Sequence, residues 1–275
     1  MNPVSNTAYY SCGVRMDDAK RDRSVCNDIY AHKFMDARGL EIYQPFRSET
    51  MPNLSNIARC RIIDERVSAE LHKSPSTTVI TIGAGFDTRP YRLRGCRWIE
   101  LDEPQVIEYK QQRLSESECE NPLTRIAIDL ASEALLEKLS RVEPTSPVVI
   151  VIGGVFMNLD PAALAQTLQQ VQRRFPRHAL LCDLMTRRFF DKFAQSVHGK
   201  LVAAGGQFSD RPENPAEIFL QHNYRLTESV PMLRRANEPG LLWDELRVPS
   251  IIFSLVLNVF KRDLQGYAVH RFDFG

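Results

Sequence analysis

The sequence lacks a long hydrophobic run, a closely spaced cysteine pair and a large net charge. Its longest apolar stretch, residues 251–260, is interrupted by Ser254 and Asn258 and is shorter than the roughly 20 residues that span a bilayer. The six cysteines are scattered and include no C-x-x-C pair, which is typical of a reducing compartment. No apolar segment follows a basic start at the N-terminus, so we expect no signal peptide and a cytoplasmic protein.

The sequence also lacks the patterns of several function classes. A formal net charge of +1 gives no general attraction to nucleic acid or to an anionic membrane, so we expect neither as a partner. Histidines and cysteines do not cluster at metal-ligand spacing, and no G-x-S-x-G motif occurs, so we expect no metal ion and no serine hydrolase chemistry. With 275 residues, 43% of them hydrophobic, the chain is long enough to bury a sizeable core.

The stretch from residue 78 to residue 110 has the order strand, glycine turn, helix, strand and acid. Thr78–Ile82 is a β-branched run, and Gly83 and Gly85 break it where missing Cβ atoms allow a ligand to approach the backbone. Asp87 and Thr88 could cap the next helix, and a second strand ends at Asp102, 19 positions after Gly83 (102 minus 83). An acid at that distance suits the hydroxyls of a ribose. The third glycine of a dinucleotide-binding turn is absent. The stretch is therefore compatible with two interpretations, a nucleotide-type cofactor site and an ordinary strand-to-helix turn.

Strands and helices alternate on both sides of this stretch. A helix is predicted over residues 52–73, and further strands over 124–128, 148–152 and 179–183. Alternation of this kind predicts an α/β fold with a doubly wound, mostly parallel sheet, in which ligands bind at the carboxyl ends of the strands. Two late strands, Tyr224–Val230 and Ser250–Phe260, have no long helix between them and predict an antiparallel pair at the sheet edge.

The ends of the chain differ from this pattern in composition. Residues 1–50 are polar and rich in tyrosine, and they predict two short helices that form either a lid across a site or a peripheral arm. Residues 51–275 form the main domain, with a predicted insert at about residues 184–222 on the substrate side.

Several motifs together resemble the leucine carboxyl methyltransferase family. They are GAGFDTRPYRL from Gly83, Trp98, ELDEPQV from Glu100 with Lys110 after it, the Asp129-Leu130 pair, and VFMNLDP from Val155. The family includes protein C-terminal carboxyl methyltransferases and bacterial O-methyltransferases that act on polyketides and other small molecules. The resemblance covers about Ala58 to Arg174, with a weaker similarity near the N-terminus. It implies a seven-stranded class I methyltransferase (Rossmann-like) sheet with an antiparallel edge pair and an N-terminal helical lid.

The resemblance also implies S-adenosylmethionine as cofactor and a role for each matching residue. Arg59 would bind the cofactor carboxylate, Asp102 the ribose hydroxyls, and Asp129 and Leu130 would frame the adenine. The remaining cofactor-binding candidates are backbone positions after the first and fourth strands: Gly83, Ala84, Gly85 and Gly153.

The sequence departs from the family at two positions. Gly153 stands where the family carries a glutamate that holds the cofactor's amino group, and Asn158 stands where the family has a tyrosine. A non-catalytic member of the family, acting through partners, is therefore one alternative.

The resemblance and the residues together predict methyl transfer to an oxygen of a small molecule, such as a polyketide or another secondary metabolite. A carboxylate acceptor is already ionised at neutral pH, whereas a phenol or alcohol would need a general base. Methylation of a protein C-terminus is a second alternative. An NAD-dependent oxidoreductase is disfavoured by the missing third glycine and by the late strand pair.

The sequence identifies no single catalytic residue and predicts no oligomeric state. Arg15 could pair with an acceptor carboxylate, although its neighbours Asp17 and Asp18 also suit a solvated arginine. The candidates for contact with the small-molecule acceptor are Tyr9, Tyr10, Arg15, Tyr30, Asn158 and His198.

Overall fold

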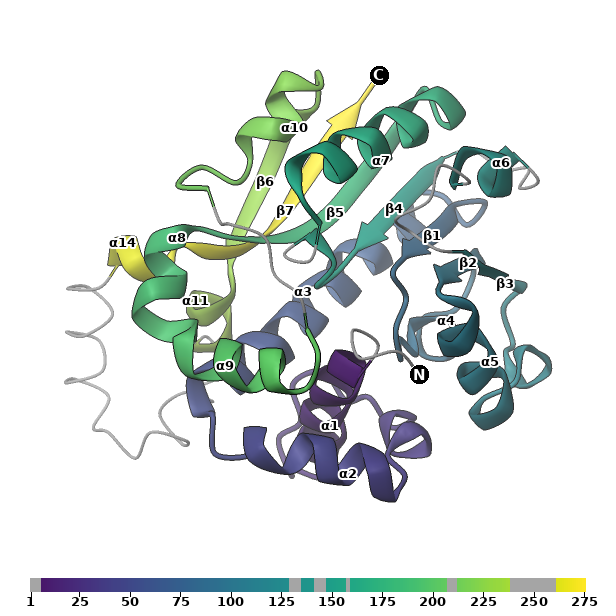
Figure 1. Ribbon diagram of the computed structural model, residues 1–275. Coiled ribbons are helices and arrows are strands. Elements are labelled where there is room, and N and C mark those ends of the chain that lie inside the picture. The colour runs from purple at the N-terminus through teal and green to yellow at the C-terminus, as the bar shows by residue number, and fades with distance from the viewer. Residues whose placement is uncertain (1–5, 129–134, 141–146, 157–158, 207–211, 238–260) are drawn as a thin grey trace.

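A single seven-stranded sheet forms the centre of the protein (Figure 1). The computed structural model describes residues 6–128, 135–140, 147–156, 159–206, 212–237 and 261–275. The strands are β1 (Thr78–Ile82), β2 (Arg97–Asp102), β3 (Leu123–Ala127), β4 (Val148–Ile152), β5 (His178–Met185), β6 (Arg225–Pro231) and β7 (Tyr267–Phe274). Their order is β3-β2-β1-β4-β5-β7-β6. The first five are parallel, and β7 runs antiparallel to both β5 and β6.

Helices cover both faces of the sheet because the central strands are apolar on both sides. Val79 and Val149 belong to the cluster that packs on α3 (Thr50–Lys73), whereas Ile80 and Ile150 belong to the cluster that packs on α7 (Pro161–Arg174). Neighbouring residues of a strand point to opposite faces, so a continuous run of Val and Ile fits a strand that is buried on both sides. Figure 1 shows α3 and α7 on opposite faces of the sheet.

The other helical elements are short. Around the glycine turn and the first half of the sheet they are α4 (Arg89–Arg92), α5 (Pro104–Arg113), η4 (Glu116–Glu118) and α6 (Leu135–Ser140). Beyond β5 they are α8 (Arg187–Phe189), the π-helical segment η6 (Phe190–Ala194), α9 (Gln195–Ala203), α10 (Glu217–Gln221), α11 (Met232–Asn237) and α14 (Lys261–Leu264). None of the helices in the described ranges combines the length and the apolar character needed to cross a membrane.

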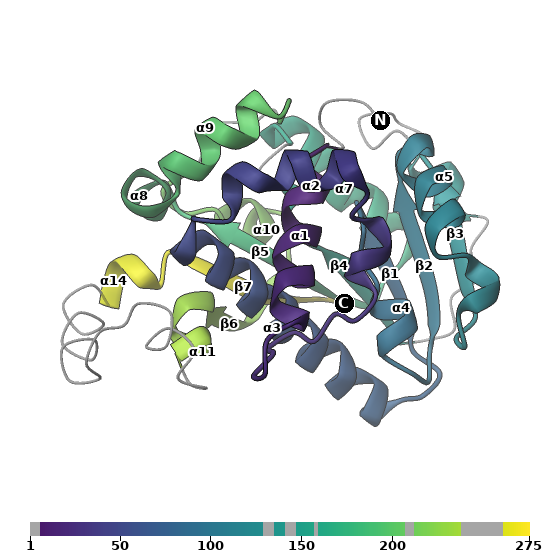
Figure 2. The same ribbon diagram turned by 90° about the horizontal axis from the view of Figure 1, so that it is seen from below.

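The N-terminal arm lies across the carboxyl ends of the parallel strands. It contains α1 (Thr7–Ala19), the 3-10 turn η2 (Ala31–Phe34), α2 (Ala37–Tyr43) and the 3-10 turn η3 (Gln44–Phe46). In Figure 2, which views the molecule from below, α1 lies in front of the sheet, and α2 and α9 lie above it in the picture. A third core cluster joins the arm to the loop after β1: Phe34 stacks on Phe86 with ring centroids 5.1 Å apart, and Tyr9 meets Phe86 edge to face at 5.0 Å. The arm is therefore packed against the turn that follows β1.

The structure confirms the predicted fold class and changes two of its details. The helix after the glycine turn is the single turn α4, and Asp87 accepts a hydrogen bond from the backbone N–H of Arg89 at 2.9 Å. The second strand of the antiparallel edge pair is Tyr267–Phe274, whereas the predicted strand Ser250–Phe260 lies outside the described residues. Strand β7, with the sequence YAVHRFDF, interrupts its apolar residues with His270, Arg271 and Asp273, so a search for a continuous apolar run missed it.

Candidate cofactor and acceptor site

The glycine turn brings the loops after β1 and β4 close together. Gly83 has φ +70°, and a Cβ atom there would lie 2.2 Å from Cγ2 of Val155 in the loop after β4. The backbone N–H groups of Gly83 and Ala84 donate to the carbonyl of Leu101 at 2.8 and 3.1 Å. A residue with a side chain at position 83 would push these two loops apart, so the glycine is required by this close approach.

Asp102 ends β2 and faces the glycine turn. Its Oδ2 accepts from the N–H of Gly85 at 2.5 Å and its Oδ1 from the N–H of Glu103 at 2.7 Å. Burial raises the pKa of Asp102 to about 6, and the two backbone N–H groups oppose that shift. A carboxylate has about four lone-pair sites. Two backbone donors therefore orient this carboxylate and leave it able to accept from two hydroxyl groups.

A cavity of about 310 Å³ lies beside this turn. Its volume falls within the roughly 300–1,000 Å³ of ordinary small-molecule sites. Residues of α1 and α3 and of the loops after β1, β2 and β4 line it, among them Arg59, Gly83, Gly85, Asp102 and Gly153. The tertiary structure thus places these predicted cofactor-binding residues around one cavity.

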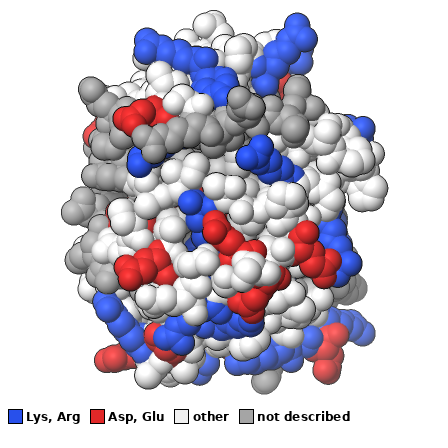
Figure 3. Space-filling view, turned by 90° about the vertical axis from the view of Figure 1, so that its right-hand side faces the viewer, with Lys and Arg blue, Asp and Glu red and all other residues white. Residues whose placement is uncertain are grey.

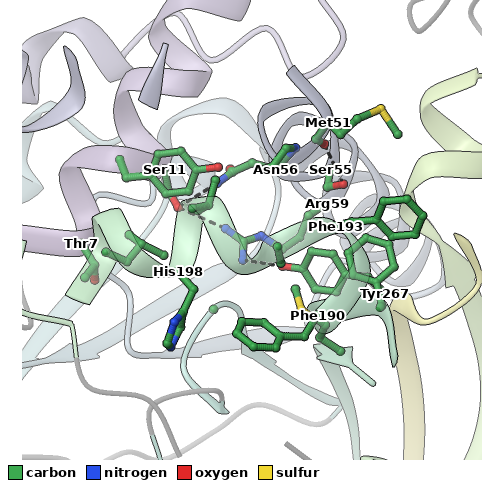
Figure 4. A pocket seen from close by; sticks show the side chains of 18 residues that line it. Thr7, Ser11, Met51, Ser55, Asn56, Arg59, Phe190, Phe193, His198 and Tyr267 are labelled. Atoms are coloured by element: carbon green, nitrogen blue, oxygen red, sulfur yellow. Dashed lines mark hydrogen bonds between the residues drawn. The ribbon is translucent and has the colours of Figure 1, made fainter. Parts of the chain in front are cut away.

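Arg59, on α3, lies where this cavity meets a second one. Its Nη1 donates to Oδ2 of Asp183 at 3.0 Å and to the hydroxyl of Tyr267 at 3.4 Å, and its Nη2 donates to Oγ of Ser11 at 3.2 Å. Figure 4 shows the guanidinium between Ser11 on one side and Tyr267 on the other. A guanidinium carries five N–H groups in a planar fork, so these contacts leave it able to bind a carboxylate as well.

Gly153 lies next to the carboxylate of Asp183. A Cβ atom at position 153 would be 3.9 Å from Oδ1 of Asp183 and 3.8 Å from Cδ1 of Ile63, both ordinary contact distances. Asp183 itself accepts from the N–H of Gly154 at 2.6 Å and from the hydroxyl of Tyr267 at 2.8 Å. A glutamate at position 153 would place a second carboxylate near this one. The acid close to this part of the site is therefore supplied by β5.

The second cavity has a volume of about 110 Å³, and six of its eighteen lining residues carry an aromatic ring. It shares five lining residues with the first cavity: Thr7, Ser11, Asn56, Arg59 and Gly154. Its other walls come from α1, α3, the end of β5, β7 and the segment from α8 to α9 (Figure 4). They are Tyr10, Met51, Pro52, Ser55, Met185, Phe189, Phe190, Phe193, Ala194, Val197, His198, Leu201 and Tyr267. We call this cavity the aromatic pocket.

Two of the predicted acceptor contacts, Tyr10 and His198, line the aromatic pocket. Arg15 lines the larger cavity instead, and its Nε pairs with Oδ2 of Asp28 at 2.8 Å while its Nη2 donates to the carbonyl of Phe86 at 2.6 Å. Arg15 therefore ties α1 to the glycine turn.

The other predicted contacts are placed elsewhere. Tyr9 is buried against Phe86, and Tyr30 packs on Tyr91 with ring centroids 5.7 Å apart. The predicted residues Asp129, Leu130 and Asn158 lie outside the described residues.

The acid and arginine of the D-T-R motif form a buried network behind the glycine turn. Arg89 pairs with Asp87 at 2.6 Å and with Asp64 of α3 at 2.6 Å, and the hydroxyl of Thr88 donates to Asp28 at 2.6 Å. These pairs hold the turn against α3 and the N-terminal arm. Within the described ranges, no group of three or more His, Cys, Asp or Glu residues is arranged to hold a metal ion.

Sequence reasoning assigned no role to Ser11, Asn56, Asp183 or Tyr267. Asp183 ends a predicted strand, where ligands are expected to bind, but unlike Asp102 it was assigned no contact from the sequence. Tyr267 was missed because β7 was missed, and Ser11 and Asn56 are small polar residues on helices whose relevance appears only in three dimensions.

The sheet order, the glycine turn and the acid at the end of β2 define a class I methyltransferase fold. In agreement, the solved structure of a DUF574 family protein from Streptomyces avermitilis has a TM-score of 0.58 to this chain, with 15% sequence identity, and the match covers 96% of each chain. The sequence profile of the leucine carboxyl methyltransferase family matches residues 10–172. The chain therefore belongs to the leucine carboxyl methyltransferase family, as predicted. The match begins at residue 10 and so includes most of the N-terminal arm.

Two bacterial relatives show how far the similarity extends. A protein from Rhodococcus jostii, named as a candidate S-adenosyl-L-methionine-dependent methyltransferase, is 29% identical over 257 residues, which cover 83% of this chain and 86% of the relative. A protein of the same description from Mycobacterium marinum is 28% identical over 130 residues, and there the chain matches 42% of the relative's length.

Proposed function

We propose that this protein transfers the methyl group of S-adenosylmethionine to an oxygen atom of a small molecule. The observation that carries the proposal is the meeting of the two cavities at Arg59, Ser11 and Asn56. One cavity has the glycine turn and strand-end acid of a nucleotide-type site, and the other offers an apolar space for an acceptor. Transfer between two bound molecules requires this adjacency, because the reacting atoms must be held about 3 Å apart and aligned.

The cofactor is S-adenosylmethionine, and the larger cavity, which we call the cofactor cavity, fits it. Asp102 accepts from the ribose hydroxyls, the turn at Gly83 and Gly85 lets the backbone approach the methionine part, and Arg59 binds the carboxylate. When bound, the cofactor supplies a methyl group on a positively charged sulfur. The contacts of Asp129 and Leu130 with the adenine of the cofactor remain a prediction from the sequence. The chain's own contribution to the reaction is then to orient both molecules and to exclude water.

The size of the aromatic pocket supports a small acceptor. A pocket of about 110 Å³ enclosed by several helices suits a free small molecule or the end of a threaded tail, and it does not suit the surface of a folded partner. We therefore favour a small molecule, such as a polyketide unit or another secondary metabolite, over a protein C-terminus. On the face in Figure 3, acidic and basic side chains occur together, which supports our proposal that nucleic acid is not a partner.

Calorimetric titration with S-adenosylmethionine, S-adenosylhomocysteine and NAD tests the cofactor. We expect micromolar binding of the first two. Asp102→Ala removes the acceptor of two hydroxyl groups and should weaken binding by about 3 kcal/mol, or roughly 100-fold. The matched control is Glu108→Ala, which removes a carboxylate from an exposed position on α5 and should bind as the natural protein does.

Three outcomes separate the alternatives. Binding of NAD alone would refute the proposed cofactor. Equal loss of affinity in both variants would refute the role of Asp102. Tight binding of S-adenosylmethionine without methyl transfer to any acceptor would favour the non-catalytic alternative that Gly153 suggests.

A further inference from the structure

The aromatic pocket has the size of one ring. A cavity of about 150 Å³ in another protein binds benzene, and the aromatic pocket has about 110 Å³. A multi-ring acceptor would therefore insert only one ring. Rings line much of the wall: Phe189 lies 5.2 Å from Phe193 and 5.5 Å from Tyr267, centroid to centroid. Aromatic walls favour a ring as guest, because aromatic pairs gain from edge-to-face and offset contacts.

The charges in the pocket select a hydroxyl over a carboxylate. Among its described lining residues, Arg59 is the positively charged one, and it is paired with Asp183 and placed at the border with the cofactor cavity. Arg59 is already assigned to the cofactor carboxylate, so the oxygen of an acceptor carboxylate that does not face the cofactor would lie among Phe side chains and neutral polar groups such as Ser55 and Asn56. Burying a charge without a partner is costly, whereas a neutral phenol can be bound there without that cost.

A hydroxyl acceptor needs a base, and the pocket contains one. His198 on α9 lines the pocket and meets the ring of Phe190 edge to face, with centroids 4.9 Å apart (Figure 4). Imidazole is the side chain whose ordinary pKa lies closest to neutral pH. Two tyrosines, Tyr10 and Tyr267, also line the pocket. Burial raises the pKa of each phenol further above neutral pH, so both stay protonated and cannot act as bases.

We infer that the acceptor is an aromatic ring that carries a hydroxyl group, and that His198 removes the proton of that hydroxyl. The inference rests on the proposed function and specifies its acceptor. A lone pair of the hydroxyl oxygen forms the new bond to the methyl carbon while the bond from that carbon to sulfur breaks. The electron pair of the broken bond stays on the sulfur of S-adenosylhomocysteine, and the hydroxyl proton moves to His198. The products are the methyl ether, S-adenosylhomocysteine and protonated His198.

Simple monocyclic probes test this inference through the formation of S-adenosylhomocysteine. We expect transfer to phenol but not to benzoate. His198→Gln should lower turnover of phenol by about 100-fold or more, the usual contribution of a general base. The same variant should lose clearly less with 4-nitrophenol, because 4-nitrophenol is much more acidic than phenol and its deprotonation depends less on a base. His72→Gln, at an exposed position on α3, is the matched control and should change neither rate.

A second variant tests the pocket without changing the histidine. Ala194 lies in the pocket wall, in the π-helical segment, and Ala194→Phe should fill the space that the ring occupies. Phenol turnover should then be lost while S-adenosylhomocysteine affinity is kept. Unchanged phenol turnover in this variant would overturn the assignment of the pocket.

The outcomes distinguish this inference from the proposed function. Transfer to benzoate and not to phenol, equal losses with both phenols in His198→Gln, or transfer to neither ring would each overturn the inference. In all three cases, retained binding of S-adenosylmethionine would leave the proposed cofactor in place. Absence of S-adenosylmethionine binding in the natural protein would refute the proposed function itself.

Discussion

Replacing Arg15 with alanine is expected to weaken fold stability and cofactor binding together. Arg15 joins the N-terminal arm to the glycine turn, through Asp28 at 2.8 Å and the carbonyl of Phe86 at 2.6 Å. The side chain of Arg15 is 12% exposed and that of Asp28 is fully buried. Arg15→Ala therefore leaves a buried carboxylate without its main partner and releases one anchor of the turn that borders the cofactor cavity.

The size of the effect follows from what remains around Asp28. Removing one partner of a buried ion pair usually costs about 3–5 kcal/mol. Asp28 keeps the hydroxyl of Thr88 at 2.6 Å and the guanidinium of Arg92 at 3.7 Å, so we expect the lower end, about 3 kcal/mol. Losing the charged hydrogen bond to Phe86 should also reduce S-adenosylhomocysteine affinity by roughly tenfold.

Urea unfolding and calorimetric titration measure the two effects. Arg23→Ala, at an exposed position on the same arm, is the control and should change neither quantity. In the double variant with Asp28→Asn, the loss of stability should be smaller than the sum of the single losses, because the two residues interact. An Arg15→Ala protein with normal stability and normal cofactor affinity, but with reduced turnover, would refute this reasoning. It would support the acceptor contact predicted from the sequence instead.

Two further predictions concern the cofactor cavity. The affinity for S-adenosylhomocysteine should be complete at pH 8 and should fall as the pH is lowered through about 6. Burial raises the pKa of Asp102 to about 6, and protonation removes an acceptor of the ribose hydroxyls. Calorimetry between pH 8 and pH 5 checks this, and an unchanged affinity over that range would contradict it. Gly83→Ala should destabilise the protein by clearly more than Gly95→Ala in urea unfolding. Both glycines have positive φ, but of the two added Cβ atoms only the one at position 83 would meet another atom within 4 Å, Cγ2 of Val155 at 2.2 Å. Equal losses of stability would show that the close approach of the two loops is unimportant.

The sequence alone determined the parallel part of the sheet and the position of the glycine turn. Strands β1 and β4 are continuous runs of β-branched and apolar residues, Gly83 and Gly85 lie in the turn after β1, and Asp102 is the last residue of β2. These signals are local, because each depends on residues that are neighbours along the chain. The location of β7 escaped this reasoning because its sequence mixes apolar and polar residues, and its strand character depends on pairing with β5 and β6, which precede it by 36 residues or more in the sequence.

Only the tertiary structure decided which side chains form the site. Arg59 meets Asp183 across 124 positions of sequence, and Arg15 meets Phe86 across 71. The aromatic pocket combines α1, α3, β7 and the segment from α8 to α9, none of which carries a recognisable motif for an acceptor. Local patterns report which residues become helix or strand, whereas contacts between distant segments depend on how those elements pack. For that reason the sequence could identify several residues that line the larger cavity, but among the predicted acceptor contacts that the structure describes, only Tyr10 and His198 line the aromatic pocket.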